Sequence, residues 1–203
     1  MNTSPGEIPW IVGVDEVGRG PIAGPVTIGV CMCHQDDLAN VITRHSDVSD
    51  SKKISPKKRV VIADALRSDY AIRHAVASVH ARVIDEIGIS KALKQAVMKA
   101  LQQLEIDPAQ TRVLLDGRLY APKKYVHQKT IVRGDQSEWV IGAASILAKV
   151  HRDQKMVQYA KKYPQYGFDS HKGYGTKQHY EKLTEHGLSP LHRRSFLKKK
   201  RAQ

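Results

Sequence analysis

The feature that most constrains the fold is a series of short apolar runs, rich in β-branched residues, that alternate with amphipathic segments. The runs occupy residues 8–14, 26–33, 70–79, 111–115 and part of 125–132. Runs of this length, bounded by turn residues, are typical of strands buried in a sheet. The first two flank a loop rich in Gly and Pro, so we expect them to pair antiparallel across that loop.

The segments between these strands have helical spacing, a helix start or a helix stop. A helix is expected at 56–69, with Ser55 as its N-cap and Pro56 as its first residue, and others at 89–104, about 137–162 and 176–186. Two polar segments, 34–55 and 168–176, are expected to be irregular. The third helix is rich in small residues, which indicates that another element packs closely against it. Because strands and helices interleave without a dividing linker, the chain is predicted to have an α/β fold with a mixed sheet.

The charge of the chain is positive and unevenly distributed. With 33 Lys and Arg against 20 Asp and Glu, the formal net charge is +13. The first fifty residues have an excess of five acidic side chains, whereas 51–100 and 151–203 have excesses of seven and nine basic ones. This pattern suits a polyanion held next to carboxylates, and nucleic acid with a divalent metal is one such arrangement. The alternative is that the basic side chains serve only solubility.

Two cysteines, Cys31 and Cys33, lie on the same face of an expected strand. They are interpreted as buried thiols, since a structural zinc site would need a second pair of ligands. No apolar run approaches the ~18 residues of a membrane-spanning helix, and the first ten residues lack the features of a signal peptide. We therefore expect a cytoplasmic protein without membrane contact, and a monomer by default.

Acidic side chains stand where the expected strands end. Asp15 and Glu16 follow the first apolar run, Asp116 follows a later one, and Asp135 follows the last short strand. Functional side chains of α/β sheets often gather at strand ends. Converging carboxylates would repel one another unless cations were present, and two divalent metals would serve attack on a phosphodiester. A ligand set of oxygens favours Mg²⁺ or Mn²⁺ over Zn²⁺.

The segment around the first acidic pair contains three glycines. Adjacent side chains on a strand point to opposite faces, so Asp15 and Glu16 reach one site only if the strand ends or bulges there. The loop is not a dinucleotide-binding loop, because Gly24 comes one position too late and the acidic pair would repel phosphates. Gly18 and Gly20 instead favour close approach of the backbone to a nucleic-acid strand, with Arg19 available for a phosphate.

Six segments, in their order along the chain, resemble motifs of bacterial ribonuclease HII. They are DEVGRGPIAGPV (15–26), DSKKIS (50–55), LLDG (114–117), RGD (133–135), AASILAKVHRD (143–153) and HKGYGT (171–176). Each motif alone is a weak signal, but the ordered set is specific and spans roughly residues 9–196. Type-three ribonucleases H carry a similar carboxylate pair, usually after a sizeable N-terminal domain. Only 14 residues precede Asp15 here, which favours the HII type.

The resemblance implies a ribonuclease-H-like fold, with a mixed central sheet flanked by helices. It implies a catalytic domain over residues 1–162, and a helical C-terminal segment over 163–203 that completes the substrate cleft and ends in a basic tail. The implied activity is metal-dependent cleavage of RNA in RNA–DNA hybrids and incision 5′ of single ribonucleotides embedded in duplex DNA. Such an enzyme serves ribonucleotide excision repair and RNA primer removal, and leaves 3′-hydroxyl and 5′-phosphate ends.

The resemblance also implies roles for individual residues. Two Mg²⁺ or Mn²⁺ ions would be held by the catalytic carboxylates Asp15, Glu16, Asp116 and Asp135. The backbone of Gly18, Arg19 and Gly20 would contact the ribose 2′-hydroxyl, which distinguishes RNA from DNA. Tyr174 would stack on the sugar of the following deoxynucleotide. The other implied substrate contacts are Ser51, Lys52, Lys53, Arg133, Ser145, Lys149, His171 and Lys172.

Some alternatives stay open from the residues alone. Asp153 shares a helical face with Ser145 and Lys149, so by spacing it competes with Asp135 as the fourth ligand; the family pattern favours Asp135. The C-terminal histidines lack metal-ligand spacing and are expected to be mostly solvated or capping residues. Two rival functions are a non-catalytic nucleic-acid-binding protein and a DNA-directed nuclease that shares the fold.

Overall fold

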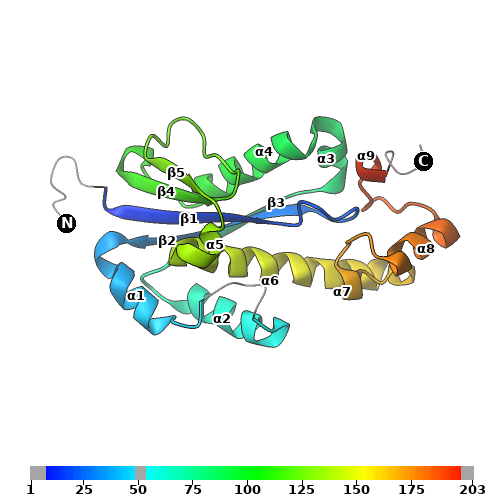
Figure 1. Ribbon diagram of the computed structural model, residues 1–203, viewed down its shortest axis with the longest axis horizontal. Helices are drawn as coiled ribbons and strands as arrows, with labels where there is room; N and C mark the ends of the chain where they lie inside the picture. The colour runs from blue at the N-terminus through cyan, green and yellow to red at the C-terminus, as the bar shows by residue number, and fades with distance from the viewer. Residues whose placement is uncertain (1–7, 49–53, 198–203) are drawn as a thin grey trace.

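A five-stranded mixed sheet forms the centre of the computed structural model, which describes residues 8–48 and 54–197. The strand order is β3-β2-β1-β4-β5, and helices lie above and below the sheet in Figure 1. β1 pairs antiparallel with β2, and β2 with β3, whereas β1, β4 and β5 run parallel. The predicted α/β class and mixed sheet are confirmed.

The strands follow the apolar runs closely. They are β1 (Trp10–Val17), β2 (Val26–His34), β3 (Arg73–Val79), β4 (Thr111–Asp116) and β5 (Gln128–Ile131). The register of β1 and β2 runs from Trp10 opposite His34 to Val17 opposite Thr27, which confirms the expected antiparallel pair across loop 18–25. Asp15 and Glu16 belong to β1 itself, so the expectation that they follow the strand is wrong by two or three residues.

Two helical layers cover the two faces of the sheet. One face packs against α3 (Ala81–Ile87) and α4 (Ile89–Gln102); the other packs against α6 (Trp139–Lys162), with α1 (Leu38–Arg44) and α2 (Pro56–Ser68) beyond it. Successive side chains of β1 alternate between the layers: Ile11 joins the core on the α6 side, and Val12 joins the core on the α4 side. The same alternation directs the functional side chains further along β1.

Helix α6 lies unusually close to the sheet. A Cβ atom added to Gly13 of β1 would lie 2.1 Å from the Val140 carbonyl carbon, and one added to Gly29 of β2 would lie 2.3 Å from the Ala144 oxygen. Only hydrogen fits in these two positions. This close packing explains the small residues of α6 and holds its N-terminal turns against β1 and β2.

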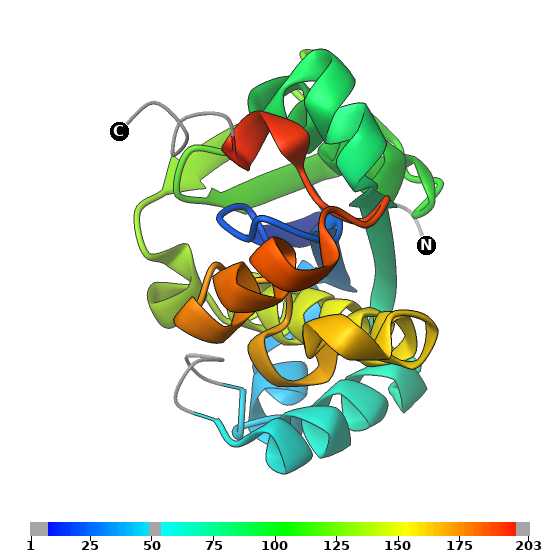
Figure 2. The same cartoon turned by 90° about the vertical axis from the view of Figure 1, so that its right-hand side faces the viewer.

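The C-terminal part of the chain contains η3 (Pro164–Tyr166), α7 (Phe168–His171), α8 (Lys177–His186) and α9 (Arg194–Leu197). Figure 2 shows α8 and α9 on either side of loop 18–25. The loop is bonded to this part by its backbone: Ile22 N–H donates to the Gly173 carbonyl at 3.0 Å, and Gly24 N–H donates to the Leu191 carbonyl at 2.8 Å. The C-terminal part therefore fixes the loop that follows the acidic pair.

Several local predictions need correction. Segment 34–55 contains η1 (Gln35–Asp37) and α1, and segment 168–176 contains α7. Helix α3 and the short η2 (Pro108–Gln110) were not predicted. These elements are short, and α1 buries only Val41, so they carry little periodic signal. The helix expected from 137 begins at Trp139, after a separate turn, α5 (Gly134–Ser137), because Glu138 is extended.

Other expectations hold. Ser55 caps α2 by accepting a hydrogen bond from Lys58 N–H, and Pro56 is its first residue. Cys31 and Cys33 are buried free thiols in the core of β2. Among the described residues, no helix combines the length and apolar character needed to cross a bilayer.

Candidate active site

A pocket of about 300 Å³ opens where β1 and β4 end beneath α6. It is lined by Asp15, Glu16, Val17, Gly18, Arg19, Gly20, Asp116, Asp135, Ser145, Lys149 and Tyr174. These residues come from β1, loop 18–25, β4, α5, α6 and the C-terminal part. The fold thus brings together side chains that are up to 159 positions apart in the sequence.

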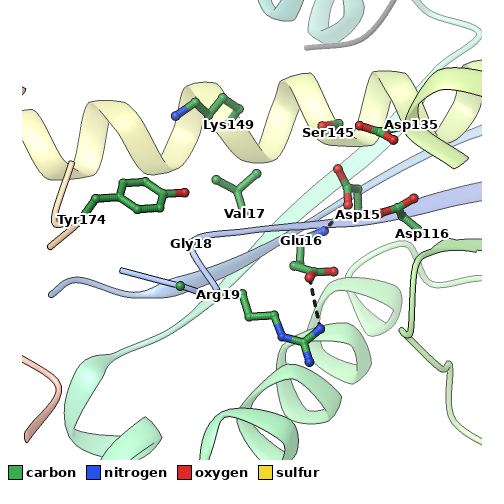
Figure 3. Close-up of a pocket in the computed structure, with 11 residues that line it drawn as sticks. Asp15, Glu16, Val17, Gly18, Arg19, Asp116, Asp135, Ser145, Lys149 and Tyr174 are labelled. Atoms are coloured by element: carbon green, nitrogen blue, oxygen red, sulfur yellow. Dashed lines mark hydrogen bonds and ion pairs between the residues drawn. The ribbon is translucent and has the colours of Figure 1, made fainter. Parts of the chain in front are cut away.

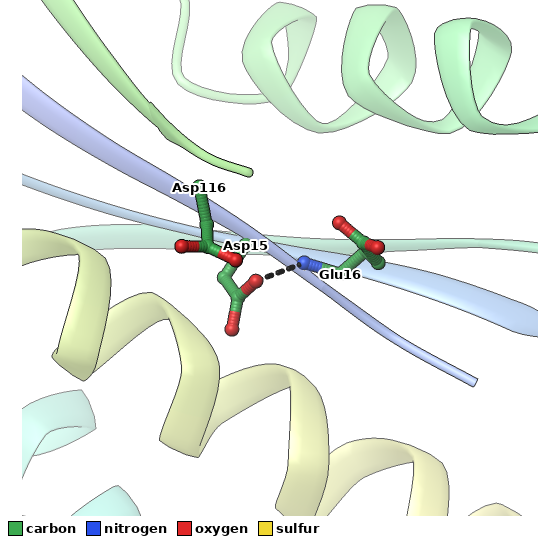
Figure 4. Close-up of side chains that lie close together, drawn as sticks. All are labelled: Asp15, Glu16 and Asp116. Carbon is green, nitrogen blue, oxygen red and sulfur yellow. Dashed lines mark hydrogen bonds between the residues drawn. The ribbon is translucent and has the colours of Figure 1, made fainter. Parts of the chain in front are cut away.

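Three carboxylates form the acidic centre of this pocket. Asp15, Glu16 and Asp116 each offer one oxygen atom, and these atoms lie within 4.8 Å of one another. Figure 4 shows Asp15 and Asp116 side by side, with Glu16 turned to the other side of β1. Hard divalent cations take carboxylate oxygens as ligands, so the donor set suits Mg²⁺ or Mn²⁺.

The convergence of Asp15 and Glu16 has a simple geometric origin. The parallel pairing between β1 and β4 extends to Val14, which lies opposite Leu115. Asp15 and Asp116 therefore lie next to each other just beyond this last pair. β4 ends at Asp116, whereas β1 continues to Val17. Because β4 no longer covers this edge of β1, side chains from both faces of β1 reach the same space. The pairing with β2 is regular here, so the strand reaches this arrangement without a bulge.

The electrostatics of the site favour the arrival of positive charge. Burial, together with the charges of Asp116 and Glu16, raises the pKa of the Asp15 carboxyl to about 7. Hydrogen bonds from the Ser145 side chain and from Glu16 N–H, the latter at 2.7 Å, act in the opposite direction. The protein therefore holds a carboxylate that is costly to ionise, and a divalent cation would remove that cost.

Asp135 stands at the edge of this acidic centre. It is buried, lines the pocket and lies beside Ser145 in Figure 3, but it is not one of the three mutually close carboxylates. Its neighbour Gly134 donates its N–H to Asp116 Oδ1 at 2.7 Å. Arg133 precedes them with a left-handed backbone (φ 56°) and is absent from the pocket lining. The RGD motif thus positions Asp116 through its glycine and presents Asp135 to the pocket.

The Gly-rich loop and Tyr174 form the other end of the pocket. Gly18 has φ +88°, a conformation that favours glycine, and Gly20 has open space where a side chain would stand. The Arg19 guanidinium lies 3.6 Å from a Glu16 oxygen. The Tyr174 side chain is 45% exposed, so its ring is accessible at the pocket. A nucleotide sugar held here would lie beside the carboxylates.

Helix α6 contributes Ser145 and Lys149 to the pocket, as their spacing predicts. Asp153, one turn further, does not line this pocket. It accepts a hydrogen bond from Lys149 Nζ at 2.9 Å and lies 3.6 Å from Arg59 Nη1. In this structure Asp153 is the partner of these two cations.

The remaining predicted substrate contacts are dispersed. Ser51, Lys52 and Lys53 lie outside the described residues. Lys172 lines a separate groove between α2 and α6. His171 is buried: its Nε2 lies 2.7 Å from the Tyr166 carbonyl oxygen, and its Nδ1 accepts a hydrogen bond from Gly173 N–H. It supports the backbone next to Tyr174.

The expectation that the C-terminal histidines are mostly solvated or capping residues is wrong for His179 and His192, and His171, expected as a substrate contact, is buried beside them. His171, His179 and His192 are buried together with Tyr166 and Phe168. Ser189 N–H donates to His192 Nδ1 at 2.9 Å, so His192 Nε2 carries the proton and donates to His179 Nε2 at 3.0 Å. His179 Nδ1 then donates to the Tyr174 carbonyl at 2.8 Å. We call this hydrogen-bonded series, from Ser189 through His192 and His179 to Tyr174, the histidine chain. Spacing in the sequence carries no signal for it, because its members meet only through tertiary folding.

A mixed sheet of this order, with carboxylates clustered at the ends of its two central strands, defines the ribonuclease-H-like class of metal-dependent nucleases. The family model for ribonuclease HII matches residues 12–199. A ribonuclease HII from Chlamydia pneumoniae is 42% identical over 186 residues, which cover 92% of this chain and 82% of that protein. The chain belongs to the ribonuclease HII family, hydrolytic endonucleases that act on RNA–DNA hybrids.

Solved structures match the fold. The ribonuclease HII from Archaeoglobus fulgidus, solved as a complex with PCNA, superposes with a TM-score of 0.74 at 23% identity, covering 91% of this chain and 94% of that one. A ribonuclease HIII solved with Mn²⁺, Bst-RNase HIII, gives a TM-score of 0.72 at 18% identity, covering 97% of this chain and 70% of that one. Both similarities show that the fold is shared.

Proposed function

We propose that this ribonuclease incises duplex DNA on the 5′ side of a single embedded ribonucleotide, besides cleaving RNA in RNA–DNA hybrids. The observation that carries the proposal is the shared pocket: Asp15, Glu16 and Asp116 lie beside a Gly-rich loop and an exposed Tyr174 ring. The carboxylates supply a place for the scissile phosphate and its cations. The loop and ring supply a place to read the adjacent sugar.

The acidic residues would hold two Mg²⁺ or Mn²⁺ ions, with Asp135 as the fourth ligand. When bound, such ions activate the attacking water and stabilise the leaving 3′-oxygen, which yields 3′-hydroxyl and 5′-phosphate ends. The proposal is supported by the all-oxygen donor set and by the raised pKa of Asp15. Gly134 N–H holds Asp116 in its orientation through a hydrogen bond to Oδ1.

Recognition of the ribonucleotide would come from the chain's own groups. The backbone of Gly18, Arg19 and Gly20 binds the ribose 2′-hydroxyl, the group by which RNA differs from DNA. Tyr174 stacks on the sugar of the following deoxynucleotide, where a 2′-hydroxyl would clash with its ring. Lys149, held by Asp153, faces the same pocket and meets a backbone phosphate. The further phosphate contacts in the proposal are Ser51, Lys52 and Lys53. Arg133, Ser145, His171 and Lys172 are proposed as substrate contacts, with His171 acting through Gly173.

The substrate cleft would be formed by residues 1–162 together with the C-terminal segment 163–203. This division is supported by Tyr174, which reaches the pocket from the C-terminal part, and by the backbone bonds from loop 18–25 to Gly173 and Leu191. In this proposal the protein acts as a monomer. The free thiols of Cys31 and Cys33 suit a reducing cytoplasm, where repair and primer removal take place.

The test is a duplex with one ribonucleotide in a 5′-labelled strand, incubated with the protein and Mg²⁺ or Mn²⁺. We expect one nick immediately 5′ of the ribonucleotide, with a 3′-hydroxyl that a DNA polymerase extends. Binding without a nick under either metal would contradict catalysis and favour a nucleic-acid-binding protein. An all-DNA duplex cut at the same rate would contradict ribonucleotide recognition and favour a DNA-directed nuclease.

A further inference from the structure

Two arginines lie completely buried beneath loop 18–25. Arg152 comes from α6 and Arg193 from the C-terminal part, and the exposed fraction of each is 0%. Within residues 8–48 and 54–197, neither guanidinium has a carboxylate within ion-pair distance. Buried cations are normally paired with carboxylates, because the cost of removing them from water is large. Two unpaired guanidinium groups at one place in the core therefore call for a functional reason.

Both guanidinium groups bind the loop through its carbonyl oxygens. Arg193 donates from Nε to Gly24 at 3.0 Å, from Nη1 to Arg19 at 2.9 Å and from Nη2 to Gly18 at 2.6 Å. Arg152 donates from Nε to the Pro25 oxygen at 2.9 Å and from Nη2 to the Ala23 oxygen at 3.3 Å. Five carbonyls of an eight-residue loop are thus turned toward the interior.

The glycines of the loop make this contact possible. A Cβ atom on Gly18 would lie 2.1 Å from Arg152 Nε, and one on Gly24 would lie 2.5 Å from the sulfur of Met156. Gly20, by contrast, has no atom within 4 Å of its Cβ position. Gly18 and Gly24 therefore leave room for the side chains of α6 that pack against the loop, whereas the space next to Gly20 is open.

The orientation of the carbonyls fixes the orientation of the amides. The described backbone contains no cis peptide bond, and in a trans peptide the N–H points opposite to the preceding carbonyl. Because the Gly18 and Arg19 carbonyls point to Arg193, the N–H groups of Arg19 and Gly20 point away from it. Gly18, Arg19 and Gly20 line the pocket and Arg193 does not, so these two N–H groups face the pocket.

The charge beneath the loop adds to this effect. Burial, and to a lesser degree the neighbouring Arg152, lowers the pKa of Arg193 to about 9, so Arg193 is a cation at neutral pH. Burial also lowers the pKa of Arg152, but a guanidinium group keeps its proton in proteins. Arg152 Nη1 has no hydrogen-bond partner within the described part of the chain. Positive charge under an N–H pair strengthens the attraction for an oxygen acceptor or a phosphate above it.

We propose that Arg152 and Arg193 are positioning residues for ribonucleotide recognition, which hold the Arg19 and Gly20 amides toward the substrate 2′-hydroxyl. The inference rests on the proposed role of loop 18–25 in reading the ribose. It adds that the selectivity of the loop depends on two buried cations that do not touch the substrate. A lysine ammonium also has three N–H donors, but all of them leave one nitrogen, so it cannot reproduce the separated contacts that Nε, Nη1 and Nη2 of Arg193 make, and Arg→Lys is not conservative here.

The primary test measures binding in EDTA, where no cleavage occurs, to a duplex with one ribonucleotide and to the same duplex made of DNA only. For Arg193→Lys we expect the preference for the ribonucleotide to fall about tenfold, as for the loss of one good hydrogen bond, while affinity for the DNA duplex stays within about twofold. Arg82→Lys, on an exposed arginine of α3, is the matched control and should change neither affinity. An unchanged preference in folded Arg193→Lys, or an equal loss on both duplexes, would overturn the proposal.

A second measurement tests the role of the two arginines independently of the proposed function. Amide hydrogen exchange and ¹⁵N relaxation of Arg19 and Gly20 in the free protein should show a less ordered loop in Arg193→Lys, and an unchanged loop in Arg82→Lys. A wild-type protein that does not prefer the ribonucleotide would refute the proposed function, and the loop measurement would still decide the role of Arg193. Arg152→Lys replaces Arg193→Lys if the latter does not fold. Failure of both variants to fold would make the arginines purely structural and contradict the inference.

Discussion

Asp15→Asn should stabilise the metal-free protein while abolishing cleavage. The Asp15 side chain is 5% exposed, and burial together with two neighbouring carboxylates raises its pKa from 3.8 to about 7. At neutral pH the folded protein therefore carries a charge that the unfolded chain accommodates at no cost. Asparagine removes that charge and keeps an oxygen in place to accept the hydrogen bond from Glu16 N–H.

The expected gain in stability can be calculated from the pKa shift of Asp15. Each pKa unit corresponds to about 1.4 kcal/mol, so a rise of about three units costs the native state roughly 4 kcal/mol once the carboxyl is ionised. The amide forfeits part of this gain because its NH₂ group must find a new partner near Ser145. We expect a net gain of about 2–4 kcal/mol, or roughly 5–15 °C in Tm for a chain of this size.

The raised pKa of Asp15 also determines how the stability of the two proteins should change with pH. Between the unfolded value of 3.8 and the folded value of about 7, the native protein binds more protons at Asp15 than the unfolded chain does. The wild type loses this contribution to stability as pH rises through that window, and Asp15→Asn does not. The Tm difference between the two proteins should thus be small at pH 4–5, grow up to pH 7 and then stay constant.

The assay is thermal unfolding followed by circular dichroism in EDTA from pH 5 to pH 8. Asp36→Asn, on a side chain that is 89% exposed, is the control and should match the wild type. Saturating Mg²⁺ should raise the Tm of the wild type and leave Asp15→Asn unchanged. A Tm gain in EDTA that is absent at pH 8, or that is equal at pH 5 and pH 8, would refute the electrostatic account of the acidic centre.

Three further predictions concern the site, the histidine chain and the packing of α6. Asp116→Asn should abolish the nick while leaving duplex binding in EDTA within about threefold, since the phosphate contacts lie elsewhere; a gel assay for both would reveal unchanged turnover if Asp116 is not in the site. Burial lowers the pKa values of His179 and His192 to about 4, so the native state disfavours their protonation, and their contribution to stability should decline as pH falls from 6.5 toward 4, opposite in sign to that of Asp15; in Asp15→Asn, where the Asp15 titration is removed, a flat profile from urea unfolding would contradict this. Gly13→Ala should cost more than about 3 kcal/mol or prevent folding, because its Cβ meets the Val140 backbone at 2.1 Å, and a wild-type Tm would show that α6 can move.

Much of the fold could be predicted because its main elements carry strong periodic signals. The β1–β2 pair shows uninterrupted apolar runs that join across a Gly- and Pro-rich loop, and α4 shows a clear apolar stripe. The short elements α1, α5 and α7 lack such signals, because a few tertiary contacts stabilise them. The exact end of β1 was also missed, since its pairing with β2 continues through Asp15 and Glu16.

Some residues of the candidate site could also be predicted from the sequence, and others could not. Asp15, Glu16 and Asp116 could be found from sequence, because each follows an apolar run directly and such positions gather at strand ends. The two arginines beneath loop 18–25, Arg152 and Arg193, could not be found in this way, because their hydrogen-bond partners are backbone carbonyls that only tertiary folding brings together. One signal was available: Arg152 is seven positions after Ser145 and three after Lys149, which places it on the same side of α6. Nothing comparable marks Arg193 or the histidine chain.

The central claim is that the clustered carboxylates hold divalent ions that cleave next to a ribonucleotide. The most direct test is the single-turnover cleavage rate of a duplex with one ribonucleotide, measured against Mg²⁺ concentration alongside the same duplex made of DNA only. The account predicts no cleavage in EDTA, a rate that rises to saturation with Mg²⁺, and an intact DNA duplex throughout. A rate that is independent of Mg²⁺ and Mn²⁺, or equal cleavage of the two duplexes, would contradict it.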